Sequence, residues 1–292
     1  MEPGRRASYS CDMSQLVPDL FRGKSAFVTG GGTGLGLEIS RGLAALGAHV
    51  VIASRNAEHH AALLTEAKAN GWSVEAAVLD VRRMADVAAL ADRLHARLAE
   101  RTQGSDAPAA FDYVVNNAAG NFVCPAERLS ERAWRAVLGI VLDGTFYCSR
   151  EFGRAMIARK EGGAILNIVA TYAWTGMPGV VHSASAKAGV LAMSKTLAGE
   201  WARHKIRVNA IAPGIFESEG AGKNLWPDEA TKQRLQDSVP AGRFATTAEI
   251  AEHCLWLLSP GASYVTGECF TVDGGASLGR GMWVPGERIE RG

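Results

Sequence analysis

The sequence lacks the features that mark secreted, metal-cluster and membrane-spanning proteins. Its five cysteines are an odd number and include no C-x-x-C pair, which argues against a disulfide framework and against a zinc cluster. No apolar run approaches the roughly 18 residues of a transmembrane helix, and residues 1–20 lack the apolar stretch of a secretory signal. We therefore expect a bacterial-type cytoplasmic protein that holds no metal and contacts no membrane.

An excess of charge of one sign is also missing. The chain has 31 Lys and Arg against 30 Asp and Glu, so its formal net charge of +1 predicts neither a nucleic-acid footprint nor a polybasic surface. The 47% of hydrophobic and 21% of charged residues are enough for a core and argue against disorder. Glycine is abundant, at 33 of 292 residues, which indicates tight turns and close backbone approaches.

From Lys24 onward, short β-branched runs alternate with Ala- and Leu-rich segments of helical spacing, a pattern typical of repeated βαβ units. It predicts strands at 25–29, 48–53, 73–79, 111–116, 164–169, 206–211 and 268–272. It predicts helices near 35–46, 57–69, 85–100, 131–159, 184–203 and 247–258. We expect one α/β domain over 23–276, with an N-terminal extension at 1–22 and a tail at 277–292.

A glycine-rich turn stands between the first predicted strand and the first predicted helix. A turn of this kind exposes backbone N–H groups and the positive end of the helix dipole, so a pyrophosphate can approach without meeting a Cβ. The turn predicts a dinucleotide site rather than a plain tight turn, because it follows a buried strand and opens an amphipathic helix. Its expected cofactor contacts are Gly30, Gly32, Thr33, Gly34, Leu35 and Gly36.

The second strand ends in Ser54 and Arg55, where a site that prefers NAD would offer an acidic residue to the ribose 2′-hydroxyl. The guanidinium of Arg55 suits a 2′-phosphate, so we expect NADP(H), although a solvated arginine is the alternative. Asp80 ends the third strand and is placed to accept from the adenine amino group, while Arg82 is placed to reach a phosphate.

Five motifs together resemble the short-chain dehydrogenase/reductase family over about Gly23 to Gly275. The motifs are Thr29-Gly30-x-x-x-Gly34-x-Gly36, Asn116-Asn117-Ala118-Ala119-Gly120, Ser185-Ala186-Lys187, Arg207-Val208-Asn209-Ala210-Ile211-Ala212-Pro213-Gly214 and Val272-Asp273-Gly274-Gly275. The resemblance implies a single Rossmann-type doubly wound parallel sheet with helices on both faces, a nicotinamide cofactor across the strand ends, and a homotetramer. It also assigns to the cofactor site Val81, Asn117, Ala118, Lys187, Pro213, Gly214 and Ile215.

The sequence departs from the family where most members carry a catalytic tyrosine, four residues before Lys187. Ser183 stands there instead, and Ala170 stands where the family has a serine. Tyr172 lies fifteen residues before Lys187, just past the fifth predicted strand. With Asn121 and Phe122, this combination resembles the 2,4-dienoyl-CoA reductases, particularly the mitochondrial type.

That closer resemblance implies the roles of the site residues. Tyr172 and Asn121 would hold the thioester oxygen, Ser183 would add a hydrogen bond, and Lys187 would bind the nicotinamide ribose and favour a lower Tyr172 pKa if the two are close. A rim aromatic without catalytic duty is the alternative for Tyr172. Asp143 resembles the aspartate that delivers the final proton in peroxisomal members, or it is a structural helix residue.

Further residues are candidates for holding an acyl-CoA substrate. Arg82, Ser130 and Lys223 are predicted to bind CoA or cofactor phosphates, and Phe122, Trp174, Met177 and Trp226 to line an acyl channel. Residues 213–230 are a candidate lid, and His182 is interpreted as a loop histidine without catalytic duty. The sequence thus predicts NADPH-dependent reduction of 2,4-dienoyl-CoA in unsaturated fatty acid β-oxidation. The alternatives are a trans-2-enoyl-CoA reductase and a non-catalytic NADP-binding protein.

Overall fold

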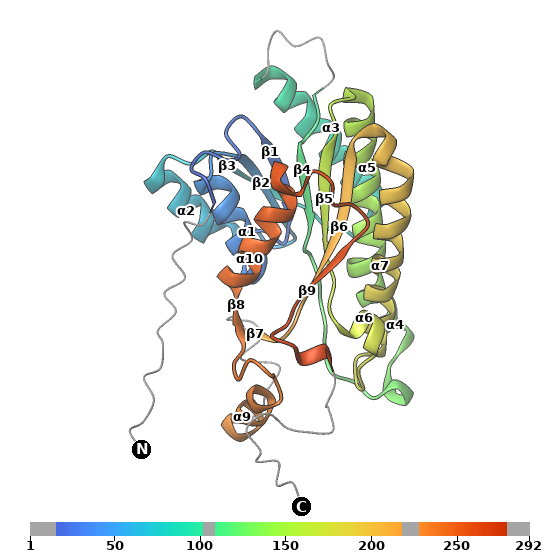
Figure 1. Ribbon diagram of the computed structural model, residues 1–292. Helices are drawn as coiled ribbons and strands as arrows, with labels where there is room; N and C mark the ends of the chain where they lie inside the picture. The colour runs from blue at the N-terminus through green and yellow to red at the C-terminus, as the bar shows by residue number, and fades with distance from the viewer. Residues whose placement is uncertain (1–15, 102–108, 218–227, 279–292) are drawn as a thin grey trace, which may run out of the picture.

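The computed structural model describes residues 16–101, 109–217 and 228–278. At its centre is a seven-stranded parallel sheet in the order β3-β2-β1-β4-β5-β6-β9 (Figure 1). The strands are β1 (Ser25–Thr29), β2 (His49–Ser54), β3 (Val74–Val78), β4 (Tyr113–Asn116), β5 (Gly163–Ile168), β6 (Ile206–Pro213) and β9 (Cys269–Val272). The chain winds outward from β1 to one edge and then from β4 to the other. The predicted doubly wound, Rossmann-type fold is therefore confirmed, and its switch point lies between β1 and β4.

Helices cover both faces of the sheet, which explains why its central strands are buried throughout. Every residue of β1 and β4 is buried, as expected for parallel strands covered on both sides. One face packs against α1 (Gly34–Ala45) and α10 (Thr247–Leu258), with α2 (Ala61–Asn70) beside α1. The other face packs against α3 (Met84–Arg101), α5 (Gly144–Arg159) and α7 (Val181–Trp201) (Figure 1).

The long helix predicted over 131–159 is divided in the structure. It consists of α4 (Glu131–Leu138), a π-helical turn (Gly139–Asp143) and α5. A π turn takes one additional residue per turn, so it rotates the following helix without breaking the chain of helical residues. Hydrophobic spacing does not reveal such a turn, because the residues on both sides remain helical.

Short elements gather at the carboxyl end of the strands. They are α6 (Tyr172–Thr175), the two-stranded pair β7 (Phe216–Glu217) and β8 (Ala245–Thr246), and α9 (Glu229–Asp237) (Figure 1). The predicted lid, 213–230, includes β7 and the start of α9, and its middle, 218–227, lies outside the described residues. Nowhere in the described ranges is a helix both long and apolar enough to cross a bilayer.

Candidate active site

The glycine-rich turn leaves β1 and enters α1 in a backbone conformation that depends on glycine. Gly30 and Gly34 have positive φ values of 64° and 52°, which side chains rarely adopt. A Cβ on Gly36 would lie 2.1 Å from the carbonyl oxygen of Gly30, so the turn folds onto the first turn of α1 without room for a side chain. The turn therefore holds its backbone against the start of the helix.

The start of α1 is free to meet an anion. The N-cap Thr33 makes no side-chain hydrogen bond to the first turn, and that turn carries no acidic residue. The N–H groups and the positive end of the helix dipole thus face no competing carboxylate from their own helix. These residues fit a nucleotide pyrophosphate.

The end of β4 is fastened to the same turn. The side-chain amide of Asn117 donates to the carbonyl oxygens of Thr29 and Gly30, both at 3.1 Å. The hydroxyl of Thr29 accepts from the backbone N–H groups of Asn117 and Ala118 at 3.0 Å. The Asn117 side chain thus satisfies backbone groups of the glycine-rich turn, and Asn117 and Ala118 lie beside that turn.

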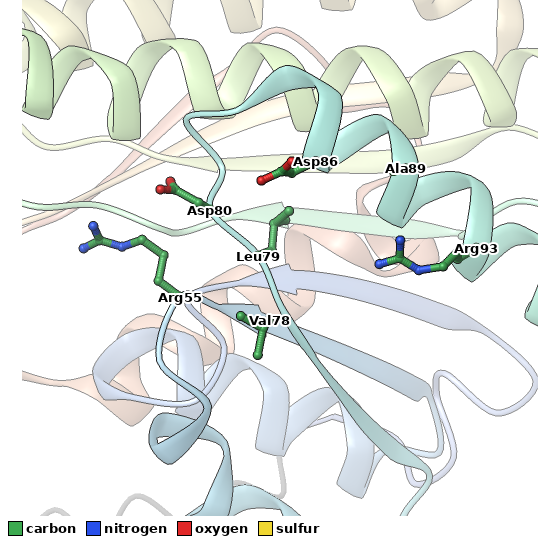
Figure 2. A pocket seen from close by; sticks show the side chains of 7 residues that line it. All are labelled: Arg55, Val78, Leu79, Asp80, Asp86, Ala89 and Arg93. Carbon is green, nitrogen blue, oxygen red and sulfur yellow. The ribbon is translucent and has the colours of Figure 1, made fainter.

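A pocket of about 420 Å³ lies at the carboxyl end of β3, against α3 (Figure 2). It brings together Arg55 and Asp80, and Figure 2 shows their side chains at one end of the pocket and Arg93 at the other. Arg55 is exposed, so its guanidinium is accessible to a ligand. The full lining is Arg55, Val78, Leu79, Asp80, Asp86, Ala89 and Arg93.

Asp80 and Arg82 are paired with each other. The Arg82 guanidinium donates to both carboxylate oxygens of Asp80, with Nε at 2.9 and 3.0 Å. These hydrogen bonds are the largest influence on Asp80 and lower its pKa, and Arg55 acts in the same direction. Arg82, which was predicted to bind a CoA or cofactor phosphate, lies beside Asp80 in the structure.

Ser54 belongs to a local network that the sequence did not reveal. Its hydroxyl donates to the carbonyl oxygen of Asn56 at 2.8 Å and lies 2.8 Å from Nε2 of buried His60. The network shapes the turn that carries Arg55. No spacing rule points to His60, which lies in the 3₁₀ turn Ala57–His60.

Tyr172 and Ser183 meet at the rim beyond β5. Their hydroxyl oxygens are 3.0 Å apart, although Tyr172 begins α6 and Ser183 lies in the first turn of α7. Burial raises the pKa of Tyr172, and the hydrogen bond from Ser183 opposes that effect. The lower Tyr172 pKa expected from Lys187 is therefore not found, because burial is the dominant influence.

Lys187 is buried on α7, one helical turn after Ser183. Its side chain is 6% exposed, and Nζ donates to the carbonyl oxygen of Ile168, at the end of β5, at 2.5 Å. Burial lowers the pKa of the ammonium to about 8, because the charged form loses its hydration. Lys187 thus ties α7 to the end of β5.

Asn121 lies on the neighbouring segment beyond β4 with its amide group exposed. Its Oδ1 accepts from the backbone N–H of Phe122 at 2.9 Å, which leaves the amide N–H₂ as the outward donor. The segment is joined to the loop before α7, because the N–H of Cys124 donates to the carbonyl of Gly179 at 2.8 Å. Asn121 and Tyr172 therefore stand on two segments that adjoin at the same rim.

The other predicted residues fall in different places. Asp143 is exposed at the end of the π turn and makes no hydrogen bond or ion pair with Lys187 in the described part of the chain. Ser130 caps α4, its hydroxyl accepting from the N–H of Ala133 at 3.2 Å, a role its position before a helical segment would have suggested. Pro213 ends β6, and Gly214 and Ile215 follow it at the carboxyl edge of the sheet. Lys223 and Trp226 lie outside the described residues.

A family model described as enoyl-(acyl carrier protein) reductase matches residues 30–277. The parallel sheet, the glycine-rich turn and the motif around Lys187 agree with that match. The chain belongs to the short-chain dehydrogenase/reductase family, whose members are oxidoreductases that use a nicotinamide cofactor.

Similar proteins with assigned names include several dienoyl-CoA reductases. The chain is 44% identical to "Probable 2,4-dienoyl-CoA reductase (2E)-enoyl-CoA-producing" of Bacillus subtilis (strain 168), over 87% of this chain and 97% of that protein. It is 38% identical to "Peroxisomal 2,4-dienoyl-CoA reductase (3E)-enoyl-CoA-producing" of Pongo abelii, over 90% of this chain and 87% of that protein.

Solved structures confirm the fold. A short chain dehydrogenase from Bacillus anthracis is 42% identical, with a TM-score of 0.75 over 88% of this chain and 98% of that one. A gluconate 5-dehydrogenase from Burkholderia cenocepacia, solved with NADP and tartrate, is 34% identical, with a TM-score of 0.81 over 90% and 99% of the two chains.

Proposed function

We propose that this protein uses NADPH to reduce 2,4-dienoyl-CoA thioesters to enoyl-CoA in the β-oxidation of unsaturated fatty acids. The observation that carries the proposal is the 3.0 Å contact between Tyr172 and Ser183. The family's usual acid, a tyrosine at the position of Ser183, is replaced, and a phenol from another element reaches the same place. The names of the relatives from Bacillus subtilis and Pongo abelii support this substrate class.

The chemistry explains what a displaced phenol can do. NADPH, when bound, supplies a hydride to the far end of the conjugated system, and negative charge then develops on the distant thioester oxygen. Tyr172 and Asn121 act as hydrogen-bond donors to that oxygen. For one such donor the stabilisation is about 2.7–4 kcal/mol, or roughly 10²–10³ in rate.

Ser183 and Lys187 support these donors. In this proposal Ser183 is the donor in the 3.0 Å hydrogen bond with Tyr172, so the phenolic O–H is directed to the substrate. Lys187 holds the end of β5 through Ile168 and presents a cation to the cofactor ribose. The buried ammonium also contributes a positive field near the developing negative charge.

The cofactor preference rests on Arg55. It is an exposed guanidinium at the end of β2 in a pocket shared with Asp80, and no carboxylate follows β2 directly. A 2′-phosphate gains charge-assisted hydrogen bonds from such a group. The relative from Burkholderia cenocepacia that was solved with NADP supports the assignment.

An apolar rim offers a place for the acyl chain. Large apolar side chains are exposed on the segment beyond β4 and on the segment from α6 to the start of α7. They are Phe122, Val123, Trp174, Met177 and Val181. The two segments touch, because a Cβ on Gly179 would lie 3.0 Å from the side chain of Val123. Exposed apolar groups gathered in this way mark a binding surface for an apolar ligand.

The product depends on where the proton arrives. After hydride addition at C5 of the dienoyl group, protonation at C2 gives the 3-enoyl thioester and protonation at C4 gives the 2-enoyl thioester. The names of the two relatives differ on this point, as (2E)- and (3E)-enoyl-CoA-producing. The reaction run in deuterated water, followed by mass spectrometry of the product, determines whether this protein protonates C2 or C4.

NADPH oxidation measured on matched dienoyl-, enoyl- and 3-ketoacyl-CoA thioesters tests the proposal. We expect turnover of the dienoyl thioester at the highest kcat/KM. Preferred turnover of the enoyl thioester would favour an enoyl reductase, and activity on the ketone alone would contradict both. NADPH binding without turnover would identify a non-catalytic protein.

The homotetramer implied by the family is a further prediction, which light scattering tests.

A further inference from the structure

His182 is a fully buried histidine that the proposed chemistry leaves unused. Its side chain is 0% exposed, and within the described part of the chain neither ring nitrogen meets a hydrogen-bond partner. A buried imidazole without such partners is unfavourable unless the ring is needed for its shape or its position. Burial lowers the pKa of His182, and the backbone of Phe122 opposes this effect, so the ring is favoured in its neutral form.

The ring of His182 is stacked on the ring of Phe122. Their centroids are 4.4 Å apart and their planes differ by 28°. Phe122 is 42% exposed, so His182 supports one face of a side chain that is otherwise open to solvent. This contact crosses from the first turn of α7 to the segment beyond β4.

Phe122 in turn determines where Asn121 points. The backbone N–H of Phe122 holds Oδ1 of Asn121 at 2.9 Å, so the direction of the Asn121 amide donor follows the position of Phe122. The segment is also attached by the hydrogen bond from the N–H of Cys124 to the carbonyl oxygen of Gly179, on the far side of Phe122 from Asn121. Without the stack, the end that carries Asn121 would lose its side-chain support.

The next residue, Ser183, supports the other donor through its 3.0 Å contact with Tyr172. Two consecutive residues of α7 therefore reach the two donors, one through a ring contact and one through a hydrogen bond. We propose that His182 is a positioning residue that places the Asn121 amide for the thioester oxygen by stacking on Phe122. This inference rests on the proposed function, because it assumes that Asn121 meets a developing oxyanion.

Two variants of His182 distinguish a role of its ring face from a role of its ring nitrogens. His182→Phe keeps a flat ring against Phe122 and removes both ring nitrogens, for which the described part of the chain offers no well-formed hydrogen bond. His182→Ala removes the ring. If the stack is what matters, the phenylalanine variant keeps the wild-type kcat within about threefold and the alanine variant does not, because donors held out of place lose rate steeply.

The experiment measures kcat, KM and NADPH affinity for the full-length wild type, His182→Ala and His182→Phe on a 2,4-dienoyl-CoA. For His182→Ala we expect kcat to fall about 10- to 100-fold, less than the 10²–10³ of a lost donor, with NADPH affinity unchanged. His95→Ala is the matched control, since the His95 ring also contacts a phenylalanine, Phe152, with ring centroids 5.3 Å apart, and its Nε2 has no hydrogen-bond partner among the described residues. It should lower stability without changing kcat at a temperature where the variant is folded.

A double-mutant cycle gives a readout that a merely structural role would not move. Asn121→Ala should lower kcat about 100-fold or more in the wild type, but less than about tenfold in His182→Ala, because the donor is already misplaced there. Fully multiplicative losses, an unchanged kcat in His182→Ala, or equal losses in His182→Ala and His182→Phe would each overturn the inference. A wild type that reduces no thioester would instead overturn the proposed function, and the inference would fall with it.

Discussion

The hydroxyl groups of Tyr172 and Ser183 lie 3.0 Å apart, although they come from different helices, α6 and α7. Ser183 stands where most of the family has its catalytic tyrosine, and it hydrogen bonds to the phenol of Tyr172, which we propose as the replacement. The pair preserves a phenolic donor at the rim while its backbone origin moves to the end of β5. This rearrangement suits a reaction whose charge develops several bonds from the carbon that accepts hydride.

Removing the serine tests the support that it gives. Ser183→Ala should lower kcat by up to about tenfold, the worth of one hydrogen bond, because Tyr172 keeps its own O–H. The pKa of Tyr172 should rise further, since Ser183 is the group that opposes the effect of burial. Steady-state kinetics and ultraviolet titration of the phenol measure both effects. Ser185→Ala, an exposed serine on the same helix, is the control, and an equal loss there would contradict the role of Ser183.

Cofactor choice should depend on Arg55. Arg55→Ala should weaken NADPH binding about 10- to 100-fold while leaving NADH binding nearly unchanged, because only NADPH carries the phosphate. Fluorescence titration with both nucleotides measures the ratio. Arg154→Ala, an exposed arginine on α5, should change neither affinity. Equal weakening of NADPH and NADH by Arg55→Ala would mean that Arg55 does not read the 2′-phosphate.

Lys187 should make stability depend on pH in the alkaline range. Its pKa is lowered by burial to about 8 in the folded chain. Unfolded lysine titrates near 10.4, so between these values the unfolded state binds more protons and stability rises with pH. Below pH about 8 the buried charge opposes folding by on the order of 3 kcal/mol.

Lys187→Met removes that charge and keeps the length of the side chain. Denaturant unfolding should show the variant more stable than the wild type at pH 7, with the difference shrinking as pH rises from 8 to 10. Lys195→Met, which replaces an exposed lysine of the same helix, should show no such convergence. A constant difference between Lys187→Met and the wild type across this range would contradict the burial argument.

Much of the fold followed from the sequence because parallel strands covered on both faces are continuous apolar runs. The strand predicted at 25–29 coincides with β1, and the helix predicted at 247–258 coincides with α10. The π turn at Gly139–Asp143 was missed because the residues around it stay helical. The start of α7 was placed three residues late, so His182 was interpreted as a loop residue, whereas it is buried in the first turn of the helix.

The candidate site was predicted unevenly, for a physical reason. Asn117 and Lys187 were predicted because each lies in a short family motif, although their hydrogen bonds reach Gly30 and Ile168, which are 87 and 19 positions away in sequence. The stack of His182 on Phe122, which joins distant segments, and the local contact of Ser54 with His60 have no spacing signature. Ser130 was predicted to bind a phosphate, although a serine just before a helix is most simply an N-cap. The structure shows its hydroxyl in that capping role.

Asn121 offers a test of the second donor. In Asn121→Asp, one oxygen can still accept from the N–H of Phe122, while the outward amide donor becomes a carboxylate oxygen. At neutral pH, kcat should fall by at least about 10²–10³, because a negative charge then faces the oxyanion. Activity should recover as pH falls and the carboxyl becomes a donor. Asn70→Asp on α2 should leave kcat unchanged, and a loss in Asn121→Asp that does not respond to pH would contradict the donor role.

Single-turnover reduction of a 2,4-dienoyl-CoA by NADPH, compared between the wild type and Tyr172→Phe, tests the central claim most directly. The variant differs by one hydroxyl, and its NADPH affinity is measured in the same preparation. We predict that the rate of NADPH oxidation falls about 10²–10³-fold while NADPH affinity is unchanged, as for the loss of one oxyanion donor. A Tyr172→Phe rate within a few-fold of the wild type would contradict the claim that this phenol stabilises the thioester oxyanion.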